Sequence, residues 1–465
     1  MSAVHDPFRP HASYSAREIW LNDPNGLVHI DGQWHMFYQA NPWGLTHGNM
    51  SWGHAISDNL LDWQELPIAI ACEDDEQIYS GSIVYDRDNT SGLGKPGDDG
   101  PLLAFYTSAY SADHGTYPSI QAQSIAVSHD RGMTWEKYTH NPILNRESTD
   151  FRDPKVLRWT NPTTGQSMWV MVAVEAVRQE VLIYSSPDLL SWQWQSTFTI
   201  DPAPGGLWEC PDLVPLTTDT GQDIWALIIS VNPGGIAGGS GTFYVLGDFD
   251  GQEFHPHPSE DLTRPRWLDY GPDFYAVTSF HNAPDNRKIC VGWQNNWDYA
   301  QLTPTGTWRS SLSVPRELSI ALSPEGCPAL VQSLVATPQD LHARGVTTLD
   351  VQLSTNGDAP ATFAVVAPDS TRDNATWPPA QPHLLFTVDP VSGCLVIDRS
   401  ASGDTAWASD FVRPITVPLG TGPDHRIRLI IDACIVTAIA HDGHSWATVQ
   451  VFAPQALTEV IYPPA

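Results

Sequence analysis

A degenerate motif that recurs at wide intervals constrains the fold of this chain more than any other feature. In each copy a polar turn opens on serine and closes on tryptophan, at residues 57–63, 128–135 and 186–192, and residues 247–251 form a weaker fourth copy. The closing tryptophans, at positions 63, 135 and 192, are 72 and 57 residues apart, which fits one four-stranded sheet plus its loops. The motif therefore predicts a β-propeller, with a polar turn and a buried tryptophan at one hairpin of each blade.

Composition and patterning support a fold made of strands. The 465 residues include 39 Pro and 34 Gly, which interrupt helices, and 19 Trp, a residue that favours strands. Short runs of apolar and aromatic residues recur through the first two-thirds of the chain, at 34–38, 102–106, 168–172 and 225–229. We expect an all-β protein with many short strands.

The pattern changes near residue 335. Beyond that point apolar and polar residues alternate plainly, as at 384–388 and 426–431, with turns such as Asp442-Gly443 between the runs. A chain of this length usually divides into more than one hydrophobic core. We therefore predict a propeller domain over residues 1–335 and a β-sandwich domain over residues 336–465.

Charge and cysteine usage exclude several classes of function. The net charge of −30 repels phosphate backbones and anionic lipid surfaces, so neither nucleic acid nor a membrane is an expected partner, whereas a neutral carbohydrate is compatible with it. The six cysteines are scattered without a CxxC pair, which predicts neither a metal site nor a disulfide framework. We expect no cofactor, and the oligomeric state stays open.

The amino terminus lacks the basic and apolar stretches of a signal peptide. No apolar run approaches the roughly 20 residues that a membrane span requires. The chain as given is expected to be cytoplasmic, or secreted if it is a mature form from which a leader has been removed.

Two segments hold an aspartate in a constrained backbone frame. Asp23 lies between Asn22 and a rigid Pro-Asn-Gly turn, three residues after Trp20. Asp153 follows Arg152 and precedes a proline. The adjacent guanidinium is expected to keep this carboxylate ionised and oriented, as suits an acceptor for sugar hydroxyls.

A third segment, Trp208-Glu209-Cys210-Pro211, surrounds a glutamate with apolar neighbours. Partial desolvation of this kind suits a carboxyl group to general acid catalysis. Glu209 follows Asp153 by 56 residues, and Asp153 follows Asp23 by 130 residues, so the three motifs fall about one to two blades apart. Because the innermost strands of a propeller face one central funnel, these carboxylates are expected to converge there. Two opposed carboxyl groups in unequal environments are the machinery of glycoside hydrolysis.

These three motifs resemble the signatures of glycoside hydrolase family 32, the invertase, inulinase and levanase group. The similarity continues in order through residues 37–39, 52–55, 79–82, 273–276, 292–297 and 308–310, and so covers the whole expected catalytic region. It implies a five-bladed β-propeller catalytic domain followed by a C-terminal β-sandwich, in agreement with the organisation described above.

The resemblance also implies roles for the carboxylates. Asp23 would be the nucleophile that attacks the anomeric carbon of a terminal β-fructofuranosyl unit in a fructan or in sucrose. Glu209 would be the acid/base, and Asp153 with Arg152 would stabilise the transition state. The reaction would retain configuration through a covalent fructosyl-enzyme, with the carboxyl groups roughly 5 Å apart.

Further positions match those that line the fructose subsite in the family, namely Asn22, Gln39, Ser80 and Trp297, and Trp20 is expected to shape the same wall. One position departs from the pattern, because His47 stands where relatives commonly carry tryptophan. The change replaces a hydrophobic platform by a smaller, titratable ring. We therefore expect His47 to alter contacts with the leaving group.

Three alternatives remain open at the level of sequence. A fructosyltransferase or a fructanase that releases difructose would use the same catalytic residues, since only acceptor subsites differ. The repeated turn is also found in sialidase-type propellers, but a tyrosine nucleophile with an arginine triad is not evident. A non-catalytic carbohydrate-binding propeller would not need a paired acid and nucleophile.

Overall fold

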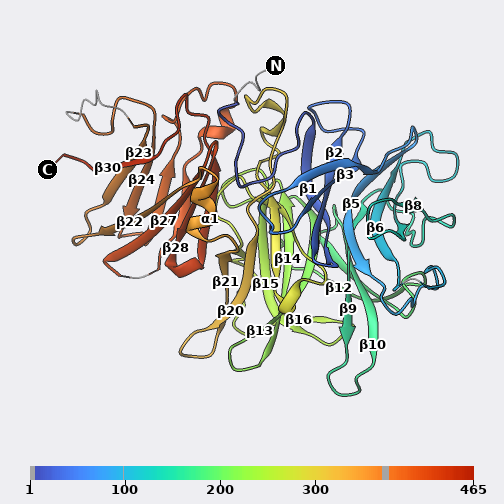
Figure 1. Cartoon of the computed structure of the whole chain (residues 1–465). Helices are drawn as coiled ribbons and strands as arrows, with labels where there is room; N and C mark the ends of the chain where they lie inside the picture. Colours follow the sequence, from blue (N-terminus) through green and yellow to red (C-terminus); the bar gives the residue numbers. More distant parts are fainter. Residues whose placement is uncertain (1–5, 98, 369–375, 421, 465) are drawn as a thin grey trace.

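The computed structural model describes residues 6–97, 99–368, 376–420 and 422–464. Figure 1 shows two parts side by side, a larger one coloured from blue to yellow and a smaller one in orange and red. Strands dominate both parts, and α1 (Pro338–Ala343) is the one α-helix among the described residues. The all-β expectation is therefore confirmed. No helix in the described ranges is long and apolar enough to cross a membrane.

The described residues of the larger part form five antiparallel sheets, and in each of them the main strands lie in chain order. The first two sheets comprise β1 (Trp20–Ile30), β2 (Gln33–Asn41), β3 (Ser51–Ser57) and β4 (Gln64–Ile70), then β5 (Glu76–Tyr85), β6 (Leu102–Tyr110), β7 (Gln121–Ser128) and β8 (Glu136–Lys137). The third comprises β9 (Phe151–Thr160), β10 (Ser167–Glu175), β11 (Glu180–Ser186) and β12 (Gln193–Phe198).

The fourth sheet comprises β13 (Leu207–Thr217), β14 (Asp223–Asn232), β15 (Gly241–Phe249) and β16 (Phe254–Pro256), with β17 (Arg266–Trp267) paired to β15. The fifth comprises β18 (Tyr275–Ser279), β19 (Ile289–Trp293), β20 (Arg316–Leu322) and β21 (Pro328–Leu334). The runs of apolar residues at 34–38, 102–106, 168–172 and 225–229 fall in β2, β6, β10 and β14, the second strands of their sheets.

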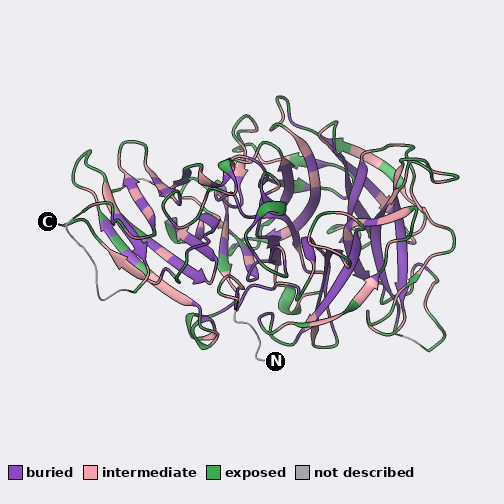
Figure 2. Ribbon diagram, turned by 90° about the horizontal axis from the view of Figure 1, so that it is seen from above, coloured by how far each residue is buried: buried purple, intermediate pink, exposed green. Residues whose placement is uncertain are grey.

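The first strands of the five sheets contact one another in a cycle. β1 contacts β5, β5 contacts β9, β9 contacts β13, β13 contacts β18, and β18 contacts β1 again. The Lys155 ammonium ties three of these strands together, since it donates to Asp212 of β13 at 2.9 Å and to the Ser279 carbonyl of β18 at 2.6 Å. A separate hydrophobic cluster fills each interface between successive sheets, including the one that joins the fifth sheet to the first. Figure 2 shows the long strands of this part buried along most of their length.

The recurring motif forms the same turn in three sheets, between the third and the fourth strand. The indole N–H groups of Trp63, Trp135 and Trp192 each donate to the carbonyl three residues earlier, at 3.0–3.1 Å. Serine hydroxyls cap the turns, as where Ser128 accepts from the amide of Gly132 at 2.8 Å. The tryptophans are half-buried rather than buried as expected, because each ring covers a hairpin near the edge of its sheet.

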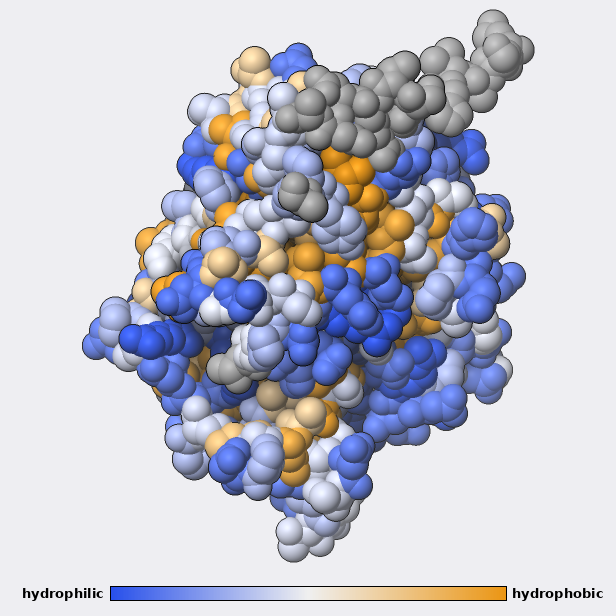
Figure 3. Space-filling view, turned by 90° about the vertical axis from the view of Figure 1, so that its left-hand side faces the viewer, coloured by the Kyte–Doolittle hydropathy of each residue, from blue (hydrophilic) through white to orange (hydrophobic). Residues whose placement is uncertain are grey.

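The smaller part consists of two further antiparallel sheets. One comprises β22 (Thr347–Ser354), β27 (Asp424–Asp432), β28 (Ile435–Ala440) and β29 (Ser445–Gln450). The other comprises β23 (Ala361–Val366), β24 (His383–Asp389), β25 (Cys394–Asp398), β26 (Ile415–Pro418) and β30 (Glu459–Ile461). Side chains from both sheets form one shared hydrophobic cluster, in which Phe363 and Phe386 stack at 4.5 Å. Figure 3 shows the outer face of this end of the molecule, which is largely hydrophilic with hydrophobic areas near its middle.

Short 3-10 turns complete the described elements, namely η1 (Pro284–Asn286), η2 (Ala300–Leu302), η3 (Ser409–Val412) and η4 (His441–Gly443). The helix α1 follows β21 and is capped by Thr337, whose side chain and that of Asp340 form a capping box. It leads directly from the last strand of the larger part to β22 of the smaller part.

Two buried ion pairs join the two parts. Arg316 of β20 pairs with Asp269 at 2.9 Å, and both also bond to Thr448 of β29. Arg399, which follows β25, pairs with Asp273 at 2.8 Å. All four charged side chains are at most 2% exposed. The junction between the parts thus contains buried polar contacts, and one of them, at Asp273, lies two residues before the strand that begins at Tyr275.

Candidate active site

Each of the five first strands has a shift in its pairing register near one end, and together these shifts shape the site. They fall between Leu21 and Pro24, Tyr79 and Gly81, Arg152 and Lys155, Glu209 and Asp212, and Tyr275 and Thr278. A β-bulge of this kind leaves residues unpaired and re-aims their side chains. Because the first strands contact one another in a cycle, the five bulges meet at one end of the larger part.

Three bulge residues adopt a left-handed backbone conformation although they are not glycine. The φ angles of Asp153, Cys210 and Ala276 are 62°, 46° and 52°. Such conformations cost about 1–3 kcal/mol each and tend to occur where function requires a special geometry. These three positions lie where the sequence places its candidate catalytic groups.

The carboxylate of Asp23 is held by its neighbours on β1 and β5. Its Oδ2 accepts from the Ser80 hydroxyl at 2.6 Å, and its Oδ1 accepts from the Asn22 amide at 3.1 Å. Asn22 is held in turn by the Trp20 indole N–H at 2.8 Å. Burial raises the pKa of Asp23, and the hydrogen bond from Ser80 opposes that shift. The predicted residues Trp20, Asn22, Asp23 and Ser80 thus form one connected group.

Asp153 and Asp23 are linked through Cys210. The Cys210 amide donates to Oδ2 of Asp153 at 2.9 Å, and its thiol contacts Oδ2 of Asp23 at 3.5 Å. Burial and the surrounding carboxylates raise the pKa of the thiol, so it stays protonated and can donate. Since Glu209 directly precedes Cys210, the three predicted carboxylates surround a single residue.

Glu209 accepts two hydrogen bonds from groups on neighbouring strands. The Tyr275 hydroxyl donates to Oε2 at 2.5 Å, and Nη2 of Arg152 donates to Oε1 at 3.2 Å. The surroundings of this carboxyl are therefore more polar than the apolar sequence context predicts. The reason is that β9 and β18 supply donors that are remote from Glu209 in the sequence.

The structure differs from the expected pairing of Arg152 with Asp153. The guanidinium points to Glu209 and to Oε1 of Gln121, at 3.3 Å, because adjacent side chains of a strand project in opposite directions. Burial raises the pKa of Asp153 to about 7; Glu209 and Asp23 add to the shift, while Arg152 opposes it. Asp153 is thus less firmly ionised than its arginine neighbour suggests.

Aromatic rings form a wall beside the carboxylates. Trp20 and Trp297 stack with their centroids 5.9 Å apart, and His47 meets the Trp297 ring edge-on at 5.3 Å. Burial lowers the pKa of His47, which Glu209 partly offsets, so this ring is neutral at neutral pH. The predicted residues Trp20, His47 and Trp297 therefore lie together, and His47 also approaches Tyr79, at 6.5 Å.

Gln39 is the predicted site residue with the least direct connection to the carboxylates. It is buried in β2, and its side-chain nitrogen donates to the carbonyl of Ile78 at 3.0 Å. This bond ties the first sheet to the strand that carries Ser80.

Sequence reasoning missed Tyr275 and the central place of Cys210. Both stand inside segments that the family resemblance covers, and Cys210 belongs to the Glu209 motif itself. The sequence gives no indication that the Tyr275 hydroxyl donates to Glu209. The direction of this side chain is set by the register shift after Tyr275 and by the contact between β13 and β18.

Comparison with known proteins places the chain in a family. Residues 14–333 match the glycosyl hydrolases family 32 N-terminal domain. The chain is 36% identical over 489 residues to the levanase of Bacillus subtilis (strain 168), covering 99% of this chain and 67% of that protein. It is also 36% identical over 493 residues to the extracellular exo-inulinase of Aspergillus awamori, covering 96% of this chain and 90% of that protein.

The fold agrees with this similarity. The crystal structure of exo-inulinase from Aspergillus awamori superposes with a TM-score of 0.84 at 31% sequence identity, and the match covers 99% of this chain and 96% of that chain. The resemblance inferred from the carboxylate motifs is thereby confirmed. The chain belongs to glycosyl hydrolase family 32 and is a glycoside hydrolase.

Proposed function

We propose that this enzyme releases terminal β-D-fructofuranosyl units from fructans of the levan or inulin type, from sucrose, or from both. The observation that carries the proposal is the convergence of Asp23, Asp153 and Glu209 around Cys210. The names of the two relatives, levanase and exo-inulinase, support a fructan as the substrate. A binding protein would not need three carboxylates gathered around one residue.

Asp23 is the proposed nucleophile. Its hydrogen bonds from Ser80 and Asn22 fix the direction of the carboxylate and favour its charged form. Attack on the anomeric carbon expels the leaving-group oxygen and forms a covalent fructosyl-enzyme. Water then hydrolyses this ester, and two displacements give net retention of configuration.

Glu209 is the proposed acid/base. When it protonates the leaving oxygen it becomes a carboxylate, and the two donors in place at Arg152 and Tyr275 stabilise that charge. The same carboxylate then removes a proton from the attacking water. Burial and the nearby Glu209 raise the pKa of Tyr275, so its hydroxyl remains a donor throughout.

Asp153 is the proposed stabiliser of the transition state. The Cys210 amide occupies its Oδ2, and within the described residues no side chain or amide bonds to Oδ1. Oδ1 is therefore available for ring hydroxyls of the fructosyl unit. Such contacts strengthen as positive charge develops on the sugar ring.

The remaining predicted residues are assigned to binding. Asn22, Gln39, Ser80 and Arg152 surround or support the carboxylates, and Trp20 and Trp297 offer an apolar wall for the fructose ring. His47 stands at the end of this wall that adjoins Tyr79, and we assign it to the leaving-group side.

The proposed architecture is a five-bladed β-propeller followed by a β-sandwich. The cycle of contacts among β1, β5, β9, β13 and β18, and the hydrophobic cluster at every interface between successive sheets, support closure of the ring. The shared cluster of the last two sheets supports the sandwich. We place the boundary between residues 335 and 336, just before α1. The extracellular relative favours export of this chain over a cytoplasmic location.

Chromatography of the products from sucrose, inulin and levan tests the proposed function. Release of fructose alone, with the rest of the chain shortened by one unit at a time, is the expected result. Disaccharide products would instead support a difructose-releasing enzyme, and new longer oligosaccharides would support a transferase. No turnover of any of the three sugars would contradict the proposal.

A further inference from the structure

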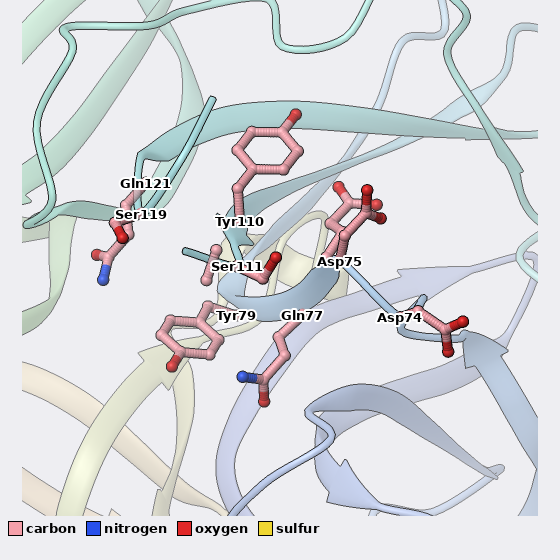
Figure 4. A pocket seen from close by; sticks show the side chains of 10 residues that line it. Asp74, Asp75, Gln77, Tyr79, Tyr110, Ser111, Ser119 and Gln121 are labelled. Carbon is pink, nitrogen blue, oxygen red and sulfur yellow. The ribbon is translucent and has the colours of Figure 1, made fainter. Parts of the chain in front are cut away.

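A separate cavity opens next to the catalytic carboxylates. It has a volume of about 220 Å³ and lies where β5, β6 and β7 meet the loops at one end of the second sheet. Figure 4 shows the rings of Tyr79 and Tyr110 on opposite sides of the opening, with Gln121 and Asp75 on the two other sides. Of the residues that line the cavity, Tyr79 and Gln121 also contact groups of the catalytic site.

 The cavity therefore shares part of its wall with the catalytic site, but its interior is separate.

Two residues connect the cavity to the catalytic groups. Gln121 accepts from Arg152 at 3.3 Å, and the same guanidinium donates to Glu209 at 3.2 Å. Tyr79 directly precedes Ser80, the residue that donates to the nucleophile, and its ring lies 6.5 Å from His47. The cavity is thus on the side of the site where the leaving group departs from Glu209.

The loop that closes the cavity is held in a fixed conformation. The amide of Ser111 donates to the Asp75 carbonyl at 2.9 Å, and the Ser119 amide donates to the Ser111 carbonyl at 3.0 Å. The rings of Tyr110, His114 and Tyr117 pack against one another with centroids 4.4–5.6 Å apart. A rigid wall lowers the entropic cost of binding.

The lining suits a neutral polyol. Tyr79 and Tyr110 are half-buried and present apolar faces, while Asp75, Ser111 and Gln121 offer acceptors and donors for hydroxyl groups. Glu76, the most enclosed of the acidic residues, is already engaged by Lys137 and by Ser108. The remaining carboxylates would repel an anionic ligand.

We propose that this cavity binds a sugar unit of the leaving chain beyond the one attached at the cleaved bond. This inference rests on the proposed function and adds a substrate preference to it. Sucrose, which loses a single glucose unit, cannot reach such a subsite, whereas a fructan chain can. Tyr110 and Asp75 are then specificity-determining residues that favour fructans over sucrose.

Kinetics on paired substrates test the proposal. The variants Tyr110→Ala and Asp75→Ala are compared with the wild type on sucrose and on an inulin-type oligosaccharide of four or more units. Tyr462→Ala and Asp219→Ala, at exposed positions outside the cavity, are the matched controls. We expect the ratio of kcat/KM for the oligosaccharide to kcat/KM for sucrose to fall on the order of tenfold for Tyr110→Ala and about threefold for Asp75→Ala. The controls keep the wild-type ratio.

A wild-type ratio in both cavity variants would overturn the proposal. If Tyr110→Ala fails to fold, its sucrose activity disappears as well, and Asp75→Ala then decides the question alone. A wild-type enzyme that cleaves neither sugar would contradict the proposed function itself, so the two failures are distinguishable.

Discussion

Two groups of carboxylates in this molecule are held in opposite ways. At the junction between the two parts, Asp269 and Asp273 each face their own arginine at 2.8–2.9 Å. Amide groups complete the set, as where the Thr448 amide donates to Asp269 and the Gln450 amide donates to Asp273. At the active site the Arg152 guanidinium bonds to Glu209, whereas Asp23 and Asp153 accept hydrogen bonds from uncharged donors.

The difference shows how the pairing of charges separates a structural carboxylate from a reactive one. The junction groups are fully neutralised and fully bonded, which suits a rigid connection. The catalytic groups are held in place, but their charges are only partly compensated, and the pKa of Asp153 rises to about 7 as burial dominates. Groups of this kind can exchange protons and can stabilise positive charge that develops on a substrate.

The largest expected effect comes from removing a reacting carboxylate at the active site. Asp23→Asn and Glu209→Gln each remove a reacting group while keeping its shape, so we expect kcat for fructose release to fall by at least about 10³-fold. Thermal unfolding followed by circular dichroism checks that both variants keep the wild-type fold. Near-wild-type turnover in either variant would contradict the assignment.

The next largest effect comes from removing one arginine of the junction pairs. Arg399→Met leaves Asp273 buried without its counter-charge, which costs about 3–5 kcal/mol. We expect Tm to fall by roughly 3–5 °C, as measured by calorimetry. Arg399→Lys, which keeps the charge, should lose less, and an unchanged Tm in Arg399→Met would show that the junction pair does not stabilise the fold.

A pair of tyrosines sharpens the comparison, because the same bond occurs in both places. The Tyr275 hydroxyl donates to Glu209 at 2.5 Å, and the Tyr299 hydroxyl donates to Asp273 at 2.5 Å. We expect Tyr275→Phe to lower kcat roughly tenfold with little change in Tm, since the lost donor stabilises charge during the reaction. Tyr299→Phe should lower Tm by a few degrees with kcat close to wild type. Equal effects of the two variants on kcat would remove the distinction.

The smallest effect concerns stability and pH. Because the folded-state pKa of Asp153 is raised, its contribution to stability is fully present below about pH 4 and is lost as pH rises to about 7. Asp153→Asn should therefore be more stable than the wild type at pH 7, by about 1 kcal/mol or roughly 1 °C in Tm, and the gain should shrink toward pH 4. Melting curves across this range provide the check, with Asp269→Asn as the control that loses stability throughout. A lower Tm of Asp153→Asn at pH 7 would contradict the account.

Much of the fold could be read from local patterns. The strand runs at 34–38 and 102–106 follow from side-chain alternation and flanking turns, and the Ser-to-Trp turns repeat because each closes a hairpin by its own hydrogen bonds. The candidate carboxylates were recognisable because proline and glycine hold the backbone beside them.

The connections among these groups could not be predicted in the same way. The Arg152–Glu209 and Tyr275–Glu209 contacts depend on register shifts in different sheets, and the Arg399–Asp273 pair joins residues 126 positions apart. Such contacts are set by how strands from distant segments meet. The composition and spacing of a single sequence do not record that arrangement.

The most direct test of the central claim is to identify the residue that carries the covalent intermediate. A β-fructofuranosyl fluoride needs no protonation of its leaving group, so Glu209→Gln should still form the ester but hydrolyse it slowly. After acid quenching and proteolysis, mass spectrometry should find one fructosyl unit attached to Asp23. Attachment to another residue, or no adduct while the fluoride is consumed, would contradict the claim that Asp23 is the nucleophile.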